Sequence, residues 1–498
     1  MTDGAHEAQV SRRTAVALGA GRARRMGSFA ARLLCSAPDR IALVLFWTAL
    51  VVSLTVLAGQ FRPVVVAPSL IVVIIATWRL TPSERPATTP NVLGALAAVI
   101  AACAWLIMNV PYASRFVVVT RDPGFLTLQG LWLTTHASPQ IPVGSALEAQ
   151  DLIADAHVWT GAFPVFDGYL YAQGAKLLPG LLALGGWFTG PPGVLAGNLV
   201  IGAVGLLAVY AFSRRLVGPW WALLPMVALG ASMPMIAFSR AAYTEPLTMC
   251  LVFAGLTMSW SAFETRTWWR HALAGAMIGA TALARIDGPA TAIGLVAGMG
   301  LVAAAPLAWR QRSRQQAALA AAGLGAAVMV LLGYVDLRWN SPGYLADLAD
   351  ELTLLTVALT ATAVAALVLT LPRRWNPLRQ LVLHRRSQLG WAAVAAVSLA
   401  AIVLLSRSWW LPGQHTDIGS AYAQVVGGLQ EREGLAIDPS RSYDDWSVRW
   451  LAWYYGWPMV GLAGLFLHDR SGAPGGGLQV DFRQRRADGH RVALAGAE

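Results

Sequence analysis

Long apolar runs alternate with short polar segments along most of the chain. Each run is close to the roughly 20 residues that a helix needs to cross a bilayer. No run alternates strictly between apolar and polar positions, so the pattern predicts transmembrane helices and not a β-barrel. We therefore expect an all-α, polytopic transmembrane helix bundle. The twelve expected spans are 41–59, 63–80, 92–110, 192–213, 218–238, 243–263, 270–284, 289–309, 317–335, 352–371, 390–405 and 451–467.

The polar segments divide the chain into three parts. Residues 1–40 are polar and rich in arginine, which predicts a disordered basic cytoplasmic tail. Residues 41–467 form the transmembrane domain, and residues 468–498 form a polar C-terminal tail. The apolar run 176–188 is too short to cross a bilayer comfortably, so we expect a juxtamembrane or re-entrant helix there.

The arginines predict the orientation of the spans. With the N-terminus in the cytoplasm, most basic residues fall in inner segments, as the positive-inside rule requires. Arg214, Arg215 and the arginines between 310 and 314 are examples. The prediction is a multi-pass protein of the cell membrane, with a long outer loop at 111–191 and a second outer segment at 406–450.

Composition supports the membrane assignment and excludes other classes. Hydrophobic residues make up 56% of the 498 residues and charged residues only 13%, about half the usual share in a soluble domain. The net charge of +11 is explained by the inner loops, and no basic stripe with interleaved aromatic residues predicts nucleic-acid binding. Three cysteines without a CxxC pair indicate neither a disulfide framework nor a zinc site.

Two carboxylates stand near the expected outer surface. Asp122 follows Arg121 at the start of the outer loop, where it could be a general base for a hydroxyl acceptor or could simply form an Asp-Pro-Gly turn. Glu245 begins the sixth expected span, at a depth where a carboxylate is costly unless it faces a polar cavity or a partner. An ion pair of Arg240 with Glu245 that only stabilises the turn is the alternative.

Three further charged residues lie at outer positions. Arg285 and Asp287 are the only charges between two apolar runs. They are either a snorkelling arginine with a capping aspartate or a phosphate-binding arginine held by its own carboxylate. Lys176 precedes the short apolar run, where it either meets a lipid phosphate or snorkels. Because all these charges fall on the outer face, a shared functional site is consistent with the predicted topology.

Several short strings between about 105 and 310 resemble the GT-C superfamily of membrane glycosyltransferases, in the branch with protein O-mannosyltransferases and lipid A aminoarabinose transferases. The strings, in chain order, are Arg121-Asp122-Pro123-Gly124 with Leu131-Trp132-Leu133, Leu178-Pro179-Gly180-Leu181-Leu182-Ala183-Leu184, Ser239-Arg240 with Thr244-Glu245-Pro246, and Ala284-Arg285-Ile286-Asp287-Gly288.

The resemblance implies an inverting transfer of a sugar from a polyprenyl-phosphate-linked donor to an acceptor hydroxyl on the outer face. It implies Asp122 as the catalytic base and Glu245 as a second site carboxylate. The implied contacts to the donor phosphate are Arg285, Lys176, Arg121 and Arg240, with Asp287 as a supporting residue.

The acceptor implied by the resemblance is a cell-envelope glycan, lipid or protein. No particular cofactor is predicted, and a divalent metal ion stays open as an alternative, since no metal-ligand spacing occurs.

The chain also departs from the family pattern. Two additional spans precede the outer loop, and the tail from 468 lacks further spans or a folded outer domain. A polytopic transporter or lipid flippase is the main alternative, since twelve spans suit one. A lipid-linked polymer ligase is a third. Against a transporter, the charges cluster at the outer ends of spans and not at the midplane, where transporters place their sites.

Overall fold

The computed structural model describes residues 3–370, except for 83–84, 120–121, 154–156 and 305–308, together with isolated residues between 380 and 403 and Gly434. The chain divides into two compact units, residues 1–396 and 397–498, and the elements described below belong to the first. The expected span 451–467, the outer segment 406–450, apart from Gly434, and the tail 468–498 lie outside the described residues, as does most of the expected span 390–405.

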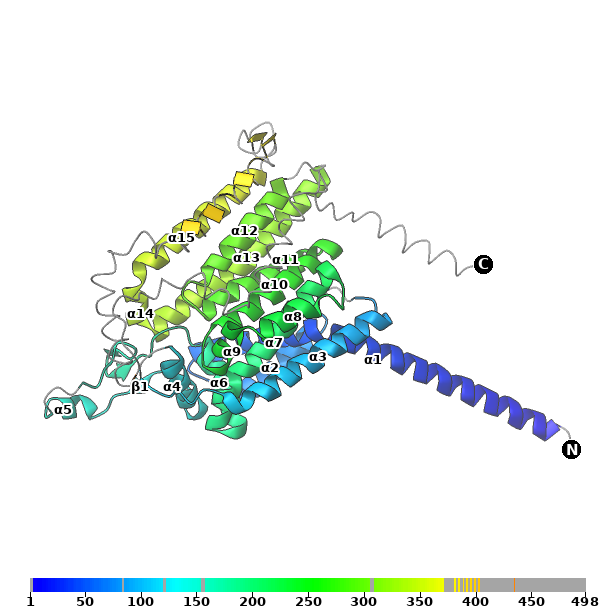
Figure 1. Cartoon of the computed structure of the whole chain (residues 1–498), viewed down its shortest axis with the longest axis horizontal. Coiled ribbons are helices and arrows are strands. Elements are labelled where there is room, and N and C mark those ends of the chain that lie inside the picture. The colour runs from blue at the N-terminus through cyan, green and yellow to red at the C-terminus, as the bar shows by residue number, and fades with distance from the viewer. Residues whose placement is uncertain are drawn as a thin grey trace. The chain divides into compact units, whose positions relative to one another are not determined.

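The described part of the chain is mostly helical (Figure 1). The first half contains α1 (Asp3–Leu57), α2 (Pro63–Thr77), α3 (Thr89–Asn109), the 3-10 turn η1 (Val110–Tyr112), α4 (Asp122–Thr135), β1 (Ile141–Pro142), α5 (Ala146–Gln150), β2 (Val165–Phe166), β3 (Tyr169–Leu170), α6 (Leu177–Thr189) and α7 (Pro191–Val217). The second half contains α8 (Leu223–Gly230), α9 (Met233–Arg240), α10 (Glu245–Thr265), α11 (Trp268–Gly279), the 3-10 turn η2 (Ala280–Leu283), α12 (Pro289–Ala304), α13 (Trp309–Asn340), α14 (Pro342–Asp347) and α15 (Ala349–Thr370).

Six of these helices are long and apolar enough to cross a membrane, which identifies a membrane protein with several transmembrane helices. They are Phe29–Leu57 of α1, Thr89–Tyr112 across α3 and η1, α7, α10, Ser313–Asn340 of α13 and α15. The consecutive helices α8 and α9 pass the same test together but are bent by 62°, so they form a seventh, broken span if they are counted as one.

The remaining apolar runs between 41 and 371 form shorter helices. Helix α2 has 15 residues, about 22 Å at the usual rise, which is less than the hydrocarbon thickness of a bilayer. The run expected to be a juxtamembrane or re-entrant helix is the 13-residue helix α6. The count of twelve spans therefore stays a prediction.

Helix α1 begins at Asp3 and passes Pro38 without ending. The first 40 residues are rich in alanine and arginine, which have high helix propensity. That residues 1–40 form a disordered cytoplasmic tail stays a prediction.

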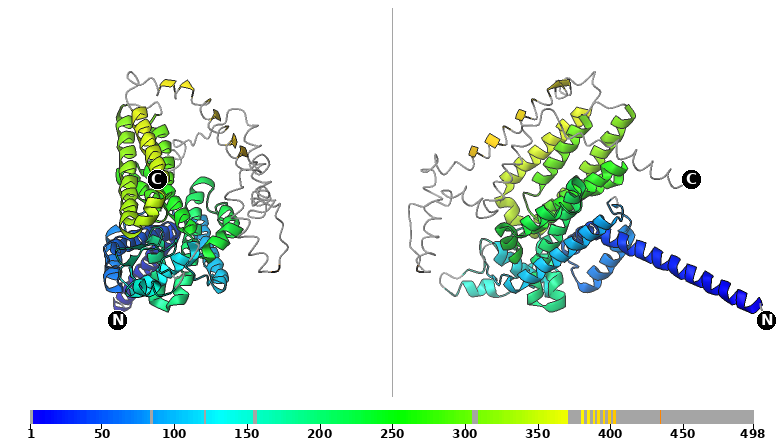
Figure 2. Two further views of the ribbon diagram at one scale, coloured as in Figure 1. Left: turned by 90° about the vertical axis from the view of Figure 1, so that its left-hand side faces the viewer. Right: turned by 45° about the vertical axis from the view of Figure 1, so that its right-hand side comes forward.

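Small residues allow the central helices to approach closely. Helix α11 packs on α10 and α13, and Gly275 of α11 lies against the backbone of Ala322 in α13, where a Cβ atom would clash. Gly325 of α13 meets Ala272 of α11 in the same way. Such contacts are typical of membrane helices, whose association depends on close packing. Helices α12, α13 and α15 lie side by side in Figures 1 and 2.

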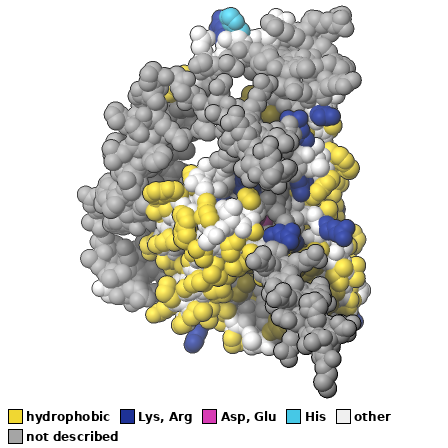
Figure 3. Space-filling model, turned by 90° about the vertical axis from the view of Figure 1, so that its right-hand side faces the viewer, with side chains coloured by type: hydrophobic (Ala, Val, Ile, Leu, Met, Phe, Trp, Pro, Cys, Tyr) yellow, Lys and Arg dark blue, Asp and Glu magenta, His cyan; other side chains and the backbone are white. Residues whose placement is uncertain are grey.

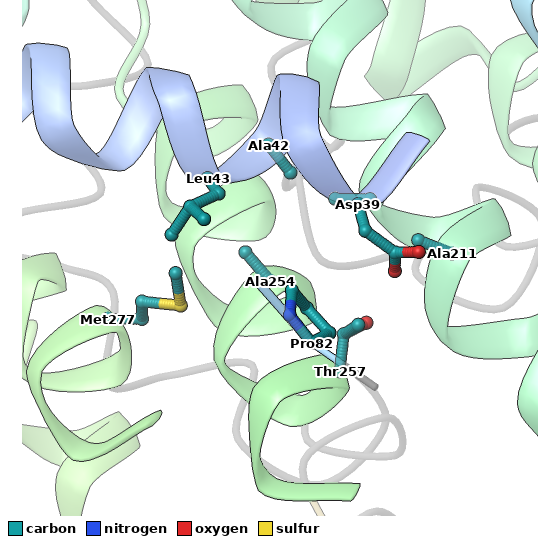
Figure 4. A pocket seen from close by; sticks show the side chains of 9 residues that line it. Asp39, Ala42, Leu43, Pro82, Ala211, Ala254, Thr257 and Met277 are labelled. Atoms are coloured by element: carbon teal, nitrogen blue, oxygen red, sulfur yellow. The ribbon is translucent and has the colours of Figure 1, made fainter. Parts of the chain in front are cut away.

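One buried ion cluster joins α1 to the C-terminal end of α7. Asp39 accepts hydrogen bonds from Arg214 and, at 2.8 Å, from Nη1 of Arg215, and all three side chains are buried. Arg214 also donates to the carbonyl oxygen of Cys35 at 2.7 Å. In Figure 4 the Asp39 side chain points from α1 toward α7 at Ala211, beside a narrow, mostly apolar cavity. The single carboxylate thus neutralises part of the charge of two neighbouring arginines.

The loop 111–191, which the sequence predicts to be outside, carries a small antiparallel sheet of strand order β1-β3-β2. Strands β2 and β3 form a hairpin whose turn residues, Asp167 and Gly168, both have positive φ, as a two-residue hairpin turn of this kind requires.

Thiol labelling tests the predicted orientation. In a cysteine-free background, a cysteine at the exposed Ser145 of the outer loop should react with a membrane-impermeant reagent added outside intact cells. A cysteine at the exposed Ser313, where the span of α13 begins, should react only after the membrane is opened. Outside labelling of Ser313→Cys would show that the orientation is inverted.

The Asp39 cluster predicts a large stability effect. Asp39→Asn keeps the shape but leaves Arg214 and Arg215 buried without their carboxylate, so the free energy of unfolding should fall by about 3 kcal/mol or more. Thermal unfolding of the detergent-solubilised protein measures the change. The matched control Asp151→Asn changes an exposed outer-loop aspartate and should leave the unfolding temperature unchanged. Equal behaviour of both variants would mean that the cluster adds nothing to stability.

Candidate functional site

The turn that precedes Glu245 is held by one buried asparagine. Asn198 of α7 is 1% exposed, and its Nδ2 atom donates to the carbonyl oxygens of Phe238, Ala241 and Tyr243 at 2.6–2.9 Å. These carbonyls belong to the end of α9 and the turn before α10. Asn198 therefore fixes the place where α10 begins, and Glu245 is the first residue of that helix.

Arg285 joins this turn to the one before α12. Its Nη1 atom donates to Oε1 of Glu245 at 2.5 Å and to Oγ1 of Thr244 at 3.4 Å. Its Nε atom donates to Oδ1 of Asp287 at 2.8 Å. The hydrogen bonds and charge of Asp287, with the charge of Glu245, raise the pKa of Arg285 despite partial burial. The guanidinium therefore stays charged and bridges two turns that are 40 residues apart.

Two polar atoms of this arrangement can form further hydrogen bonds beyond those to the described residues. Oε2 of Glu245 is buried and accepts no hydrogen bond in that part of the chain. Nη2 of Arg285 donates to Asp287 at 3.2 Å, and its second N–H has no acceptor among the same residues. The Glu245 and Arg285 side chains are 39% and 33% exposed, so a ligand has access to both. The site can accept a hydrogen bond and donate one.

Tyr344 of α14 is influenced by charges of two segments singled out in the sequence. Burial raises the pKa of Tyr344, and the charges of Asp122 and Asp287 raise it further, while Arg285 lowers it. Hydrogen bonds of Arg285 join the turn before α10 to the turn before α12. Asp122 forms no hydrogen bond or ion pair with either turn in the described part of the chain, so a site shared by all three segments stays a prediction.

Asp122 occupies the first turn of a helix and not a free turn. It is exposed and begins α4, where the helix dipole favours a negative charge. Gly124, two residues on, faces the loop before α4: a Cβ atom there would lie 2.5 Å from the carbonyl oxygen of Val118. The glycine of the Asp-Pro-Gly string therefore lets this loop fold against the start of α4.

A second buried polar cluster holds α14 near the outer loop. Lys176 is 1% exposed, and its Nζ atom donates to the carbonyl oxygens of Ala172 and Gly174 at 2.5 and 2.8 Å and to Oγ of Ser341 at 2.8 Å. Oδ2 of Asp336 accepts a 2.9 Å bond from the Lys176 backbone N–H. Burial lowers the pKa of Lys176 to about 7, and the charge of Asp336 opposes this shift.

The cluster changes how Lys176 is interpreted. It was singled out as a donor-phosphate contact, but its ammonium group is enclosed by protein oxygen atoms in this structure. This geometry favours the structural task of joining the loop before α6 to the end of α13. Phosphate binding by Lys176 stays a prediction, and it would require this cluster to open.

Arg240 lies beside the site but faces another way. Its Nε atom donates to Oδ1 of Asn109 at 2.9 Å, and its guanidinium stacks on the Tyr112 ring at 4.7 Å. Glu245 thus pairs with Arg285 and not with Arg240, which was the alternative considered from the sequence. Arg121 lies outside the described residues. Donor-phosphate contacts by Arg240 and Arg121 stay predictions.

The described part of the chain offers no evident set of ligands for a metal ion. Within it, no group of three or more histidine, cysteine, aspartate or glutamate side chains is placed to hold a metal ion. The divalent metal left open by the sequence analysis has no assigned ligands.

Sequence reasoning missed Asn198, Tyr344 and Asp336. Asp336 was detectable, because a lone carboxylate at the end of an apolar run is costly and needs a partner. Asn198 lies inside an apolar run, where an amide also needs partners. Tyr344 gave no signal, since a tyrosine after Pro-Gly is ordinary in a loop.

No protein-family model, curated protein or solved structure matches this chain. The resemblance to GT-C glycosyltransferases therefore rests on the short strings in the sequence alone.

The Asn198 contacts predict that one side-chain amide contributes strongly to the stability of the turn before α10. Asn198→Ala removes the donor to the turn carbonyls and leaves buried acceptors unpaired, so the free energy of unfolding should fall by about 2 kcal/mol. Asn91→Ala is the matched control, because Asn91 makes one exposed side-chain bond to the Pro86 carbonyl. Thermal unfolding of both variants in detergent checks the prediction, and a drop as large for Asn91→Ala contradicts it.

Proposed function

We propose that this protein is a membrane glycosyltransferase of GT-C type, with about twelve spans. It transfers a sugar from a polyprenyl-phosphate-linked donor to an acceptor hydroxyl on the outer face. The acceptor is a cell-envelope glycan, lipid or protein. The short strings that resemble GT-C enzymes support this proposal, and so does the position of the charged residues at one end of apolar helices.

One observation carries the proposal. Arg285 binds Glu245 and Asp287, which belong to two different turns. Lone charges that only snorkel have no reason to converge from separate segments, whereas a site that binds a polar substrate requires it. The Glu245 and Arg285 side chains are 39% and 33% exposed, so a substrate can contact them.

The proposed mechanism is a single displacement. Asp122 accepts the proton of the acceptor hydroxyl as its oxygen attacks the anomeric carbon. The bond from that carbon to the phosphate oxygen breaks, and the polyprenyl phosphate leaves with the electron pair. Arg285 donates to a phosphate oxygen through its remaining N–H and stabilises the charge that develops on the leaving group. Glu245 and Asp287 hold the guanidinium in place.

One feature favours the transporter or flippase as a second candidate. Helices α8 and α9 form a broken span with a 62° bend, and broken helices are common at transporter binding sites. The α9 end of this pair leads directly into the turn held by Asn198. The charged residues, however, lie at helix ends, which suits a reaction at one face better than passage through the membrane.

An activity assay with a matched variant tests the proposed function. Purified protein is incubated with radiolabelled polyprenyl-phosphate hexoses and pentoses and with membrane acceptors. Asp122→Asn should lower turnover roughly 100-fold or more, because the amide cannot accept a proton, while donor binding changes little. Asp151→Asn, an exposed aspartate of the same loop, should keep wild-type turnover.

Two results would count against this function. Wild-type turnover by Asp122→Asn would leave Asp122 as a residue that only begins α4. Donor movement across vesicle membranes without any sugar transfer would favour the flippase.

A further inference from the structure

The turn after α2 is approached by two arginines from different helices. Arg40 of α1 donates through Nη1 to the Trp78 carbonyl at 3.2 Å, and Arg270 of α11 donates through Nη2 to the Thr81 carbonyl at 3.1 Å. The two carbonyls are three residues apart, so both guanidinium groups lie at one short segment.

Each of these arginines also stacks on a tryptophan. The Arg40 guanidinium lies 4.7 Å from the centre of the Trp78 ring, and that of Arg270 lies 4.9 Å from the centre of the Trp269 ring. Trp78 is 48% exposed. Tryptophan and arginine together are typical of the level of lipid headgroups at a membrane surface. The segment from Trp78 to Thr81 is therefore placed where a headgroup lies.

A groove runs from this segment between α1 and α2. Its lining is mainly apolar and includes Leu43 and Val44 of α1 and Ile74 of α2, with Arg40, Trp78 and Thr81 at its polar end. Trp47 also lines the groove, and its buried Nε1 donor has no partner among the described residues. The groove thus combines an apolar wall, an N–H donor without a partner among the described residues, and Arg40, whose Nε atom also donates to Oγ of Ser36 at 2.9 Å.

Two unpartnered donors point to an acceptor that the protein does not supply. Nε of Arg270 is buried and, like Nε1 of Trp47, donates to nothing in the described part of the chain. The neighbouring carboxylate of Glu264 is held by Arg85 at 3.1 Å. An anion with several oxygen atoms, attached to an apolar chain, matches the donors, the charge and the wall.

This groove is separate from the candidate active site. Glu245 begins α10, whereas Glu264, beside Arg85, lies near its other end, roughly 28 Å away along the helix. Figure 3 views the protein from the side on which the start of α1 projects in Figure 1. On this face, lysine and arginine side chains clearly outnumber acidic ones beside hydrophobic surface. In the predicted topology it is the cytoplasmic face, where anionic lipids are enriched.

We propose that the groove between α1 and α2 binds an anionic phospholipid of the membrane leaflet opposite the candidate active site. The lipid phosphate lies between Arg40 and Arg270, and one acyl chain follows the wall formed by Leu43, Val44 and Ile74. Nε1 of Trp47 donates to an ester carbonyl of the lipid. A free phosphate ion would leave this wall and the Trp47 donor unused, so the occupant is a lipid.

Lipid retention by the purified full-length protein tests the proposal. The probes are phosphatidylglycerol and phosphatidylcholine with identical acyl chains, and native mass spectrometry in detergent counts the bound lipids. Wild type should retain phosphatidylglycerol in preference to phosphatidylcholine. Arg40→Gln or Arg270→Gln should weaken phosphatidylglycerol binding about five-fold each, and the double variant roughly thirty-fold.

Three control measurements distinguish a specific lipid-binding site from general attraction of lipid to surface charge. Arg62→Gln makes the same charge change at the exposed opposite end of α2 and should leave binding unchanged. Ile74→Trp fills the groove, keeps both arginines and should lower retention as strongly as the double variant. Millimolar inorganic phosphate should not displace the lipid.

Any of four results would overturn the proposal. They are equal retention of both lipids by wild type, wild-type binding by the double variant, unchanged binding by Ile74→Trp, and release of the lipid by inorganic phosphate. Because Ile74→Trp leaves every charged contact in place, it decides the question even if the double variant fails to fold.

Discussion

Charge is tolerated in an apolar helix bundle only where it has a partner or reaches the end of a helix, and this constraint organises the protein. At the C-terminal end of α7, Asp39 neutralises part of the charge of Arg214 and Arg215 and ties α1 to α7. At the N-terminal end of α10 the charges are reversed, because the cation Arg285 binds two carboxylates, one of them Glu245. The spans between these ends carry few charges because the membrane would penalise them.

The two ends differ in how completely their charges are enclosed. Asp39, Arg214 and Arg215 are buried, and both carboxylate oxygens accept hydrogen bonds, so this cluster has a structural role in holding α1 against α7. Glu245 and Arg285 are about one-third exposed. A binding site needs side chains that a ligand can reach, and a buried ion cluster does not offer them. The difference in exposure makes the Glu245 end the more accessible of the two clusters.

The sequence located most described helices, because hydropathy and length are local properties of a segment. It could also mark Glu245 and Arg285 as costly charges, but it could not pair them, since their contact depends on how α10 and α11 pack. The nearer Arg240 was the partner considered, and it binds Asn109 instead. The break between α8 and α9 was also missed, because two short apolar helices and one straight span have the same hydropathy.

The charge balance at the open end limits how two substrates could bind together. Glu245 and Asp287 place two carboxylates beside the guanidinium of Arg285. An anionic phosphate is repelled by carboxylates, so it must approach from the side of the guanidinium. A neutral hydroxyl has the opposite preference, because it donates its proton to a carboxylate oxygen. Under the proposed function, a donor phosphate on Arg285 and an acceptor hydroxyl on a carboxylate would therefore be sorted by charge alone, with the sugar between them.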